Sequence, residues 1–307
     1  MPEILPRPQE TSAVLNAKNN VSSPAAEAPS GKGQRLGRQA LLPVQSGFEE
    51  ISPAIAPLDK APQTLDTATL PAVARLNDCY GRLDTRDLLQ RAIHDIFPGR
   101  IAAVSAFGSE SALLLALIAE VAPDLPVIFL DTGKHFPETL VYRDRLAKHL
   151  GLSNLRVVTP DPAGLRREDQ EGRLWATDPD GCCRLRKVLP LKGALSGFDA
   201  WISGRKRIHG GERRALAVFT ALGPQIQINP LAHWTEEEIE KAFAERGLPA
   251  HPLVSSGYRS IGCAVCTAAS TGASGGRDGR WPGFTKTECG IHWTAGAPTR
   301  VGTPDQG

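Results

Sequence analysis

The sequence contains no long apolar run and few cysteines, and each shortage excludes a class of protein. No segment approaches the roughly 20 consecutive apolar residues of a transmembrane helix, so we expect no membrane partner. Six cysteines in 307 residues are too few for a secreted disulfide scaffold. The N-terminus lacks both a secretory signal pattern and the acid-poor composition of a transit peptide, which favours a cytoplasmic protein. The net charge of +2 gives no reason to expect a nucleic-acid partner.

Composition divides the chain into three parts. Residues 1–65 hold many prolines and no Trp, Tyr or Cys, so this segment cannot offset its ordering entropy by burial. We predict a disordered extension there, with only a weak helical signal around residues 38–42. Residues 66–254 are predicted to form an α/β domain, and residues 255–307 a glycine-rich C-terminal segment without strong periodicity.

Between residues 66 and 254, short apolar runs alternate with amphipathic segments. The pattern predicts helices at 85–97, 109–122, 137–151 and 235–247, with a further helix at 184–195 interrupted by Pro190. It predicts buried strands at 101–107, 126–131, 155–160, 200–204 and 225–230. Such alternation is typical of a doubly wound, mostly parallel sheet, which is our predicted fold class.

Two polar loops follow the first two predicted strands. "SAFGSESA" leads from a strand through a glycine into a helix N-terminus, where free N–H groups favour an anion, although a simple turn capped by Ser109 would look similar. "LDTGKHFPET" lies at the end of the next strand, the edge of open α/β sheets where ligands bind. The candidate substrate-binding residues are Ser105, Gly108, Ser109 and Ser111 in the first loop and Asp131, Thr132 and Gly133 in the second.

A basic segment, "SGRKRIHGGERRALAVF", follows the predicted strand at 200–204. Arginine side chains pair bidentately with phosphate or sulfate oxygens, whereas a solvated basic loop is the alternative for such a run of charge. Its position after a buried strand favours anion binding. The candidate ligands are Arg205, Arg207, Arg213 and Arg214.

Four cysteines form two pairs, the adjacent Cys182 and Cys183 and the CxxC pair Cys263 and Cys266. Either zinc or an iron–sulfur cluster could bind four thiolates. Zinc sites usually space both pairs as CxxC, and an adjacent pair fits that pattern poorly. The spacing therefore favours an iron–sulfur cluster and leaves zinc as the alternative.

Cys289 stands alone in "TKTECGIHW". Lys286 and His292 are close enough in sequence to lower its pKa, and the thiolate is the reactive form of cysteine. An unreactive surface cysteine is the alternative. We expect the remaining cysteine, Cys79, to be a small buried hydrophobic residue.

Taken together with "GRW" at Gly279–Trp281, these motifs resemble the assimilatory adenylyl-sulfate reductases of the adenine-nucleotide alpha-hydrolase-like superfamily. The resemblance covers roughly residues 83–293. It implies a [4Fe-4S] cluster on the four paired cysteines. We expect that cluster to have an electrostatic and structural role that acts through Lys187, near the adjacent pair. It also implies that Cys289 is the catalytic nucleophile, forming an S-sulfocysteine, that adenosine 5′-phosphosulfate is the substrate, and that reduced thioredoxin or glutaredoxin is the electron donor.

Two other functions remain open from the sequence. One is a 3′-phosphoadenylyl-sulfate reductase, or an enzyme that accepts both nucleotides. The other, from a different class, is a zinc-stabilised nucleotide- or RNA-binding module in which Cys289 is inert. The sequence leaves the oligomeric state open, and a homo-oligomer is compatible with it.

Overall fold

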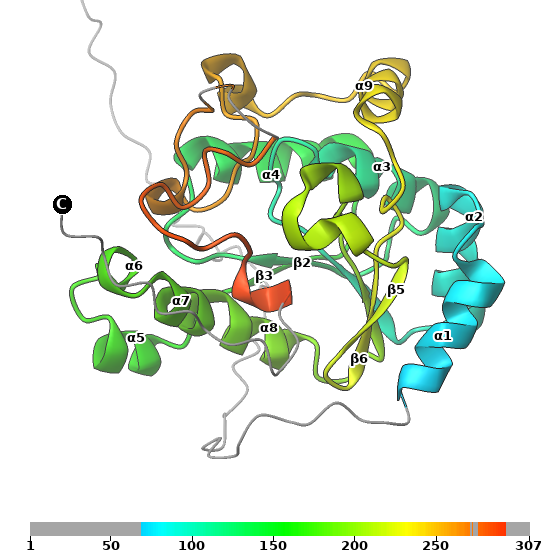
Figure 1. Ribbon diagram of the computed structural model, residues 1–307, viewed down its shortest axis with the longest axis horizontal. Helices are drawn as coiled ribbons and strands as arrows, with labels where there is room; N and C mark the ends of the chain where they lie inside the picture. Colours follow the sequence, from blue (N-terminus) through cyan, green and yellow to red (C-terminus); the bar gives the residue numbers. More distant parts are fainter. Residues whose placement is uncertain (1–68, 271, 273–275, 293–307) are drawn as a thin grey trace, which may run out of the picture. The chain divides into compact units, whose positions relative to one another are not determined.

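A computed structural model describes residues 69–270, 272 and 276–292 (Figure 1). The predicted disordered extension at 1–65 and the weak helical signal at 38–42 lie outside these residues. All of the described residues belong to one contact unit, Asp59–Gly307. None of the helices in the described part of the chain has both the length and the apolar character that crossing a lipid bilayer requires.

A six-stranded sheet lies at the centre, in the order β3-β2-β1-β4-β6-β5. Neighbouring strands are parallel except for β5, which pairs antiparallel with β6. The strands are β1 (Ile101–Val104), β2 (Val127–Leu130), β3 (Leu155–Val158), β4 (Ala200–Ile202), β5 (Phe219–Leu222) and β6 (Gln225–Ile228). The predicted fold class, a mostly parallel α/β sheet, is confirmed.

Helices cover both faces of the sheet, because successive strand residues point to opposite sides. In β1, Ile101 and Ala103 join the larger core, while Ala102 joins a smaller core on the other face with Leu191 and Leu195. The larger core is covered by α1 (Thr69–Tyr80), α2 (Thr85–Gln90), α3 (Ser111–Val121), α4 (Pro137–Leu150) and α9 (Glu236–Glu245). The smaller is covered by α8 (Leu189–Ala194), on the opposite side of the sheet in Figure 1.

Local sequence signals fix the ends of two predicted helices. Helix α4 begins with Pro137 in its first turn and ends before Gly151, whose φ of 67° suits a left-handed C-terminal cap. Helix α9 begins after Thr235, and Thr235 and Glu238 form a reciprocal capping box. Both boundaries agree with the predictions to within a residue or two.

Elsewhere the structure differs from the predicted elements. Strand β5 was not predicted, and the strand predicted at 101–107 ends at Val104 because the chain turns at Phe107, whose φ is 49°. The helix predicted at 85–97 is α2 followed by a π-helical turn, Arg91–Ile96. The predicted interruption at Pro190 is wrong, because the chain stays helical from α7 (Pro179–Cys183) through a π-helical turn, Arg184–Val188, into α8, and the winding changes from π- to α-helical directly before Leu189 and Pro190.

The remaining elements are short. Two further helices, α5 (Pro162–Glu168) and α6 (Leu174–Thr177), precede α7. Single 3₁₀ turns occupy Arg207–His209, Gly211–Ala215, Pro252–Ser256, Ala264–Cys266 and Gly290–His292. In the described residues after 255 the regular structure consists of such turns and two isolated bridges, His135 with Cys263 and Thr267 with Arg280.

The prediction for Cys79 is wrong. Its side chain is exposed on α1, because the helix turns Val73, Leu76 and Tyr80 toward the core instead.

A buried ion pair ties the β2–α4 loop to the helices on the other face. Asp169 and Arg186 lie 2.6 Å apart, with side chains only 1% and 8% exposed. Arg186 also donates to the carbonyl of Thr132 at 2.7 Å, and Asp169 accepts from the backbone N–H of Leu174 at 2.8 Å. Burial opposes ionisation of Asp169, but the hydrogen bonds and charge of Arg186 outweigh it and lower the pKa of the carboxyl group.

We predict that Asp169→Asn lowers the free energy of unfolding by about 3 kcal/mol, because it leaves the buried guanidinium of Arg186 without a counter-charge. The matched control is Asp95→Asn, which breaks the exposed Arg91–Asp95 pair and should cost less than about 1 kcal/mol. Urea denaturation at neutral pH measures both. Equal losses in the two variants would contradict the assignment of Asp169–Arg186 as a structural pair.

Candidate active site

An open pocket lies where the strand order reverses. The chain leaves β1 toward β2 and β3 on one side and continues from β4 toward β6 and β5 on the other. Ser105 follows β1, and Ser203 and Gly204 follow β4; all three line the pocket. In doubly wound sheets this crevice at the carboxyl ends of the strands is where ligands bind.

The loop after β1 brings the first turn of α3 to this pocket. Gly108 allows the C-terminal segment to pass close by, since a Cβ there would lie 3.0 Å from the carbonyl oxygen of Ile261. The hydroxyl of Ser109 does not cap the helix; it donates to the carbonyl of Arg259 at 2.6 Å. The residue before the helix is Glu110, and its side chain makes no capping bond. The predicted residues Ser105, Gly108, Ser109 and Ser111 all line the pocket.

The four predicted arginines separate into two groups. Arg205 and Arg213 are buried and line the pocket. Arg207 instead lines a separate hollow and donates to the carbonyl of Leu216 at 2.7 Å, while Arg214 is exposed. The structure therefore brings two of the four predicted anion ligands to the pocket.

Asn229 holds both ends of the loop that carries these arginines. Its side chain accepts from the hydroxyl of Ser203 at 2.7 Å and donates to the carbonyl of Ala217 at 3.0 Å. Its own backbone N–H bonds to Val218 at 2.7 Å. Both ends of the loop are thus fixed at the pocket edge.

Asp131, Thr132 and Gly133 do not line this pocket. The Thr132 hydroxyl lies 3.2 Å from the sulfur of Cys263, and Asp131 accepts from the backbone N–H of Gly133. Their predicted contact with a nucleoside remains a prediction, and in the structure this loop supports the cysteines.

The four paired cysteines gather beside the pocket. Cys182, Cys183 and Cys263 are buried and Cys266 is partly buried. Burial raises the pKa of Cys182 to about 11, and the charges of Cys263 and Cys266 act on the same thiol. No group of three or more His, Cys, Asp or Glu side chains in the part of the chain described here is arranged to hold a single metal ion.

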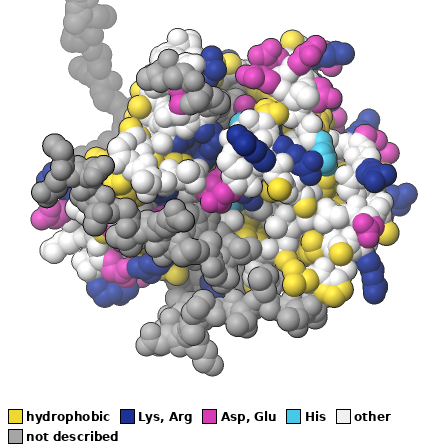
Figure 2. Space-filling view, viewed as in Figure 1, with side chains coloured by type: hydrophobic (Ala, Val, Ile, Leu, Met, Phe, Trp, Pro, Cys, Tyr) yellow, Lys and Arg dark blue, Asp and Glu magenta, His cyan; other side chains and the backbone are white. Residues whose placement is uncertain are grey.

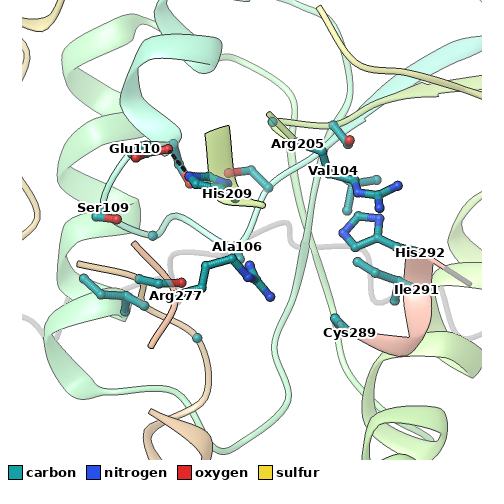
Figure 3. Close-up of a pocket in the computed structure, with 18 of the residues that line it drawn as sticks. Val104, Ala106, Ser109, Glu110, Arg205, His209, Arg277, Cys289, Ile291 and His292 are labelled. Atoms are coloured by element: carbon teal, nitrogen blue, oxygen red, sulfur yellow. Dashed lines mark ion pairs between the residues drawn. The ribbon is translucent and has the colours of Figure 1, made fainter. Parts of the chain in front are cut away.

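Cys289 lines the pocket and is partly buried (Figure 3). A hydrogen bond from Cys183 lowers its pKa; burial opposes this shift, and the charge of Lys187 supports it. Burial would also lower the pKa of Lys187, but the surrounding sulfurs of Cys263, Cys289 and Cys183 raise it. Lys187 is therefore a half-buried cation beside the predicted nucleophile.

The two other residues predicted to act on Cys289 have different partners. Lys286 forms an ion pair with Asp180. The ring of His292 stacks on Trp201 at 5.8 Å, and its Nδ1 lies 3.0 Å from the side-chain nitrogen of Gln227. Burial, with the charges of Arg205 and Arg213, lowers the pKa of His292, so its ring is neutral at neutral pH.

Sequence reasoning gave no role to several pocket residues, although Arg280 and Trp281 belong to the quoted motif "GRW". Trp281 is 2% exposed and carries cations on its ring, with Arg280 at 4.5 Å and Arg277 at 5.5 Å from the ring centre. The Nε atoms of Arg205 and Arg280 are buried without a hydrogen-bond partner. Lys and Arg side chains gather near the middle of the face in Figure 2. In the sequence, the signal for these residues was two arginines close to a tryptophan in "GRDGRW". No sequence pattern pointed to Glu110 and His209, which also line the pocket.

Comparison with known proteins agrees with this geometry. The family model described as the phosphoadenosine phosphosulfate reductase domain matches residues 100–269, more than half of the chain. The chain belongs to this family.

Curated relatives and a solved structure extend the match. A protein of Mesorhizobium japonicum named adenosine 5′-phosphosulfate reductase is 47% identical over 74% of this chain and 89% of the relative. A Mycobacterium tuberculosis protein of the same name is 41% identical over 62% of this chain and 75% of its own. The crystal structure of phosphoadenylyl-sulfate reductase from Candida auris, in a phosphate complex, is 25% identical with a TM-score of 0.54, covering 64% of this chain and 95% of the other.

Proposed function

We propose that the protein reduces adenosine 5′-phosphosulfate to sulfite and AMP in assimilatory sulfate reduction, with reduced thioredoxin or glutaredoxin as the electron donor. One observation carries the proposal: the lone Cys289 lines a pocket at the strand switch point, among buried arginines. The names of the 41–47% identical relatives support the choice of reaction.

The pocket supplies donors for an anionic nucleotide. The uncapped first turn of α3 favours negative charge, and the guanidinium groups of Arg205 and Arg280, which line the same pocket, suit phosphate or sulfate oxygens. These fixed donors stabilise the charge that develops on the AMP phosphate as it leaves.

The reaction takes place in two thiol steps. The Cys289 thiolate attacks the sulfate sulfur, the sulfur–oxygen bond to the phosphate breaks, and AMP leaves with the electron pair. A donor thiolate then attacks the Cys289 sulfur of the S-sulfocysteine and sulfite departs. The second donor thiol resolves the mixed disulfide and returns Cys289 to its thiol form, so the donor supplies both electrons.

Cys182, Cys183, Cys263 and Cys266 would hold a [4Fe-4S] cluster. The donor set fits, because four thiols gather near the half-buried ammonium of Lys187, which can compensate the charge of thiolate ligands, and the Thr132 hydroxyl can donate to Cys263. Such a cluster would supply a fixed electrostatic environment beside the nucleophile. With Cys183 as a ligand, Lys187 and Arg280 remain to lower the pKa of Cys289.

Anaerobically purified protein should contain about four irons and four sulfides per chain, as a four-cysteine cluster requires. Replacing any one of the four paired cysteines by serine should lower the iron content, whereas Cys79→Ser, on the exposed face of α1, should not. Stoichiometric zinc without sulfide in active protein would contradict the cluster and favour the zinc alternative.

Cys289→Ser should bind the nucleotide, keep its iron and release no sulfite, because a serine hydroxyl stays protonated without a dedicated base. Wild-type protein given substrate without a thiol donor should carry a sulfonate on the peptide containing Cys289, and reduced thioredoxin should release it as sulfite. Mass spectrometry and sulfite assays measure both. A sulfonate on any other cysteine would disprove the mechanism, with Cys79→Ser as the control.

The 3′-phosphorylated nucleotide is the alternative substrate. The observation against it is the shared name of the 41–47% identical relatives; the phosphoadenylyl-sulfate reductase structure is 25% identical. Values of kcat/KM for the two nucleotides, measured side by side, decide between them. A higher value for the 3′-phosphorylated form would change the substrate and leave the thiol chemistry intact.

A further inference from the structure

A series of charged side chains runs through the pocket wall, starting at the first turn of α3. Lys206 donates to the carboxylate of Glu110 at 2.6 Å, and the Nε2 atom of His209 lies 3.2 Å from the same oxygen. Figure 3 shows the Glu110–His209 contact on the side of the pocket opposite Cys289. The side chain of Lys206 is 2% exposed, that of Glu110 33% and that of His209 15%, so this part of the wall is largely shielded from water.

His209 joins this group to Arg213. Its Nδ1 lies 3.0 Å from a terminal nitrogen of the Arg213 guanidinium. A guanidinium can only donate, so Nδ1 must accept, and the ring proton must sit on Nε2, where it donates to Glu110. The two partners therefore select one neutral tautomer of His209 and one orientation of Arg213.

Arg213 in turn holds the residue before the nucleophile. Two of its nitrogens donate to the two carboxylate oxygens of Glu288, one at 2.8 Å, and both side chains are under 8% exposed. Arg277 lies 3.7 Å from the same carboxylate. Glu288 precedes Cys289 directly, so the orientation of Arg213 fixes the backbone from which the thiol projects.

We propose that His209 is a positioning residue that, through Arg213 and Glu288, holds Cys289 at the pocket. The role in turnover rests on the proposed function, whereas the role in holding the thiol does not. Without an acceptor at Nδ1, Arg213 has a free donor in the wall and is free to turn toward the pocket. Glu288 then loses its paired hydrogen bonds, and the segment with Cys289 leaves its position more often.

Two substitutions separate the two ring nitrogens. In His209→Asn the amide oxygen occupies the position of Nδ1 and accepts from Arg213, but the side chain is too short to reach Glu110. In His209→Gln the amide reaches Glu110 but places no acceptor beside Arg213. The positioning role predicts that Asn rescues and Gln does not, whereas a general packing role treats the two amides alike.

The first readout is the alkylation rate of Cys289 by iodoacetamide, measured by peptide mass spectrometry on the anaerobic holoenzyme without nucleotide. The exposed thiol of Cys79 serves as the internal reference. His209→Gln should be alkylated at Cys289 about tenfold faster than wild type, the effect of losing a hydrogen bond to a charged group. His209→Asn should stay within about twofold of wild type.

The second readout is steady-state kinetics with adenosine 5′-phosphosulfate. In His209→Gln, kcat should fall about tenfold because the placement of the thiol is lost, whereas KM should change less than kcat because Arg205 and Arg280 remain in place at the pocket. His209→Asn should recover kcat. If His209→Gln does not fold, Glu288→Gln weakens the same contact from the other end and should give the faster alkylation.

Equal alkylation of the Asn and Gln variants, or a wild-type rate in Glu288→Gln, would overturn the positioning role. Faster alkylation of His209→Gln in a protein that makes no sulfite would support the positioning role and reject the proposed function. Normal sulfite formation together with an unchanged alkylation rate of Cys289 in every variant would reject the positioning role and support the proposed function.

Discussion

The buried ion pair between Arg213 and Glu288 is the contact on which the arrangement of the pocket depends. Burial alone would keep Glu288 protonated, but Arg213 and then Arg277 outweigh it and lower the pKa of Glu288 to about 2. The carboxylate is therefore charged throughout the physiological range. Removing either side of such a pair leaves an uncompensated charge in the interior. A C-terminal segment made of single turns thus reaches a defined position through charge rather than through a core of its own.

Much of the sheet was predictable, because buried parallel strands and capped helices carry local signals. Strand β2 is a continuous apolar run, and the start of α9 is marked in the sequence by the capping box of Thr235 and Glu238. Strand β5 was missed, since its four residues carry no strong strand signal of their own and form a strand by pairing with β6 across the turn at Gly223. The π-helical turns were missed for a similar reason: no residue type marks a wide turn, and tertiary packing selects it.

The candidate site divides in the same way. The cysteine pairs were visible because their spacing is short and unusual, and Cys289 because it stands alone between charged neighbours in a motif that resembles the family's. The wall opposite Cys289 was not, because Glu110 and His209 meet only after β1 and β4 lie side by side. The loop at Asp131 was assigned to the nucleotide from its position at a strand end. Leu130 and His135, on either side of that loop, line the pocket, whereas Asp131, Thr132 and Gly133 do not, so their contact with a nucleoside remains a prediction.

The clamp made by Asn229 has a consequence for how this protein can vary in length. The side chain of Asn229 bonds to both Ser203 and Ala217, so the two ends of the arginine loop between them are held at a fixed separation. At its tip, Gly210 and Gly211 have φ values of 66° and 56°, a left-handed conformation that favours glycine. They lie between His209 and Arg213, whose side chains are 3.0 Å apart, so residues inserted at this tip would separate His209 from the arginine that holds Glu288. The length of the arginine loop is therefore constrained at its tip as well as at its clamped ends.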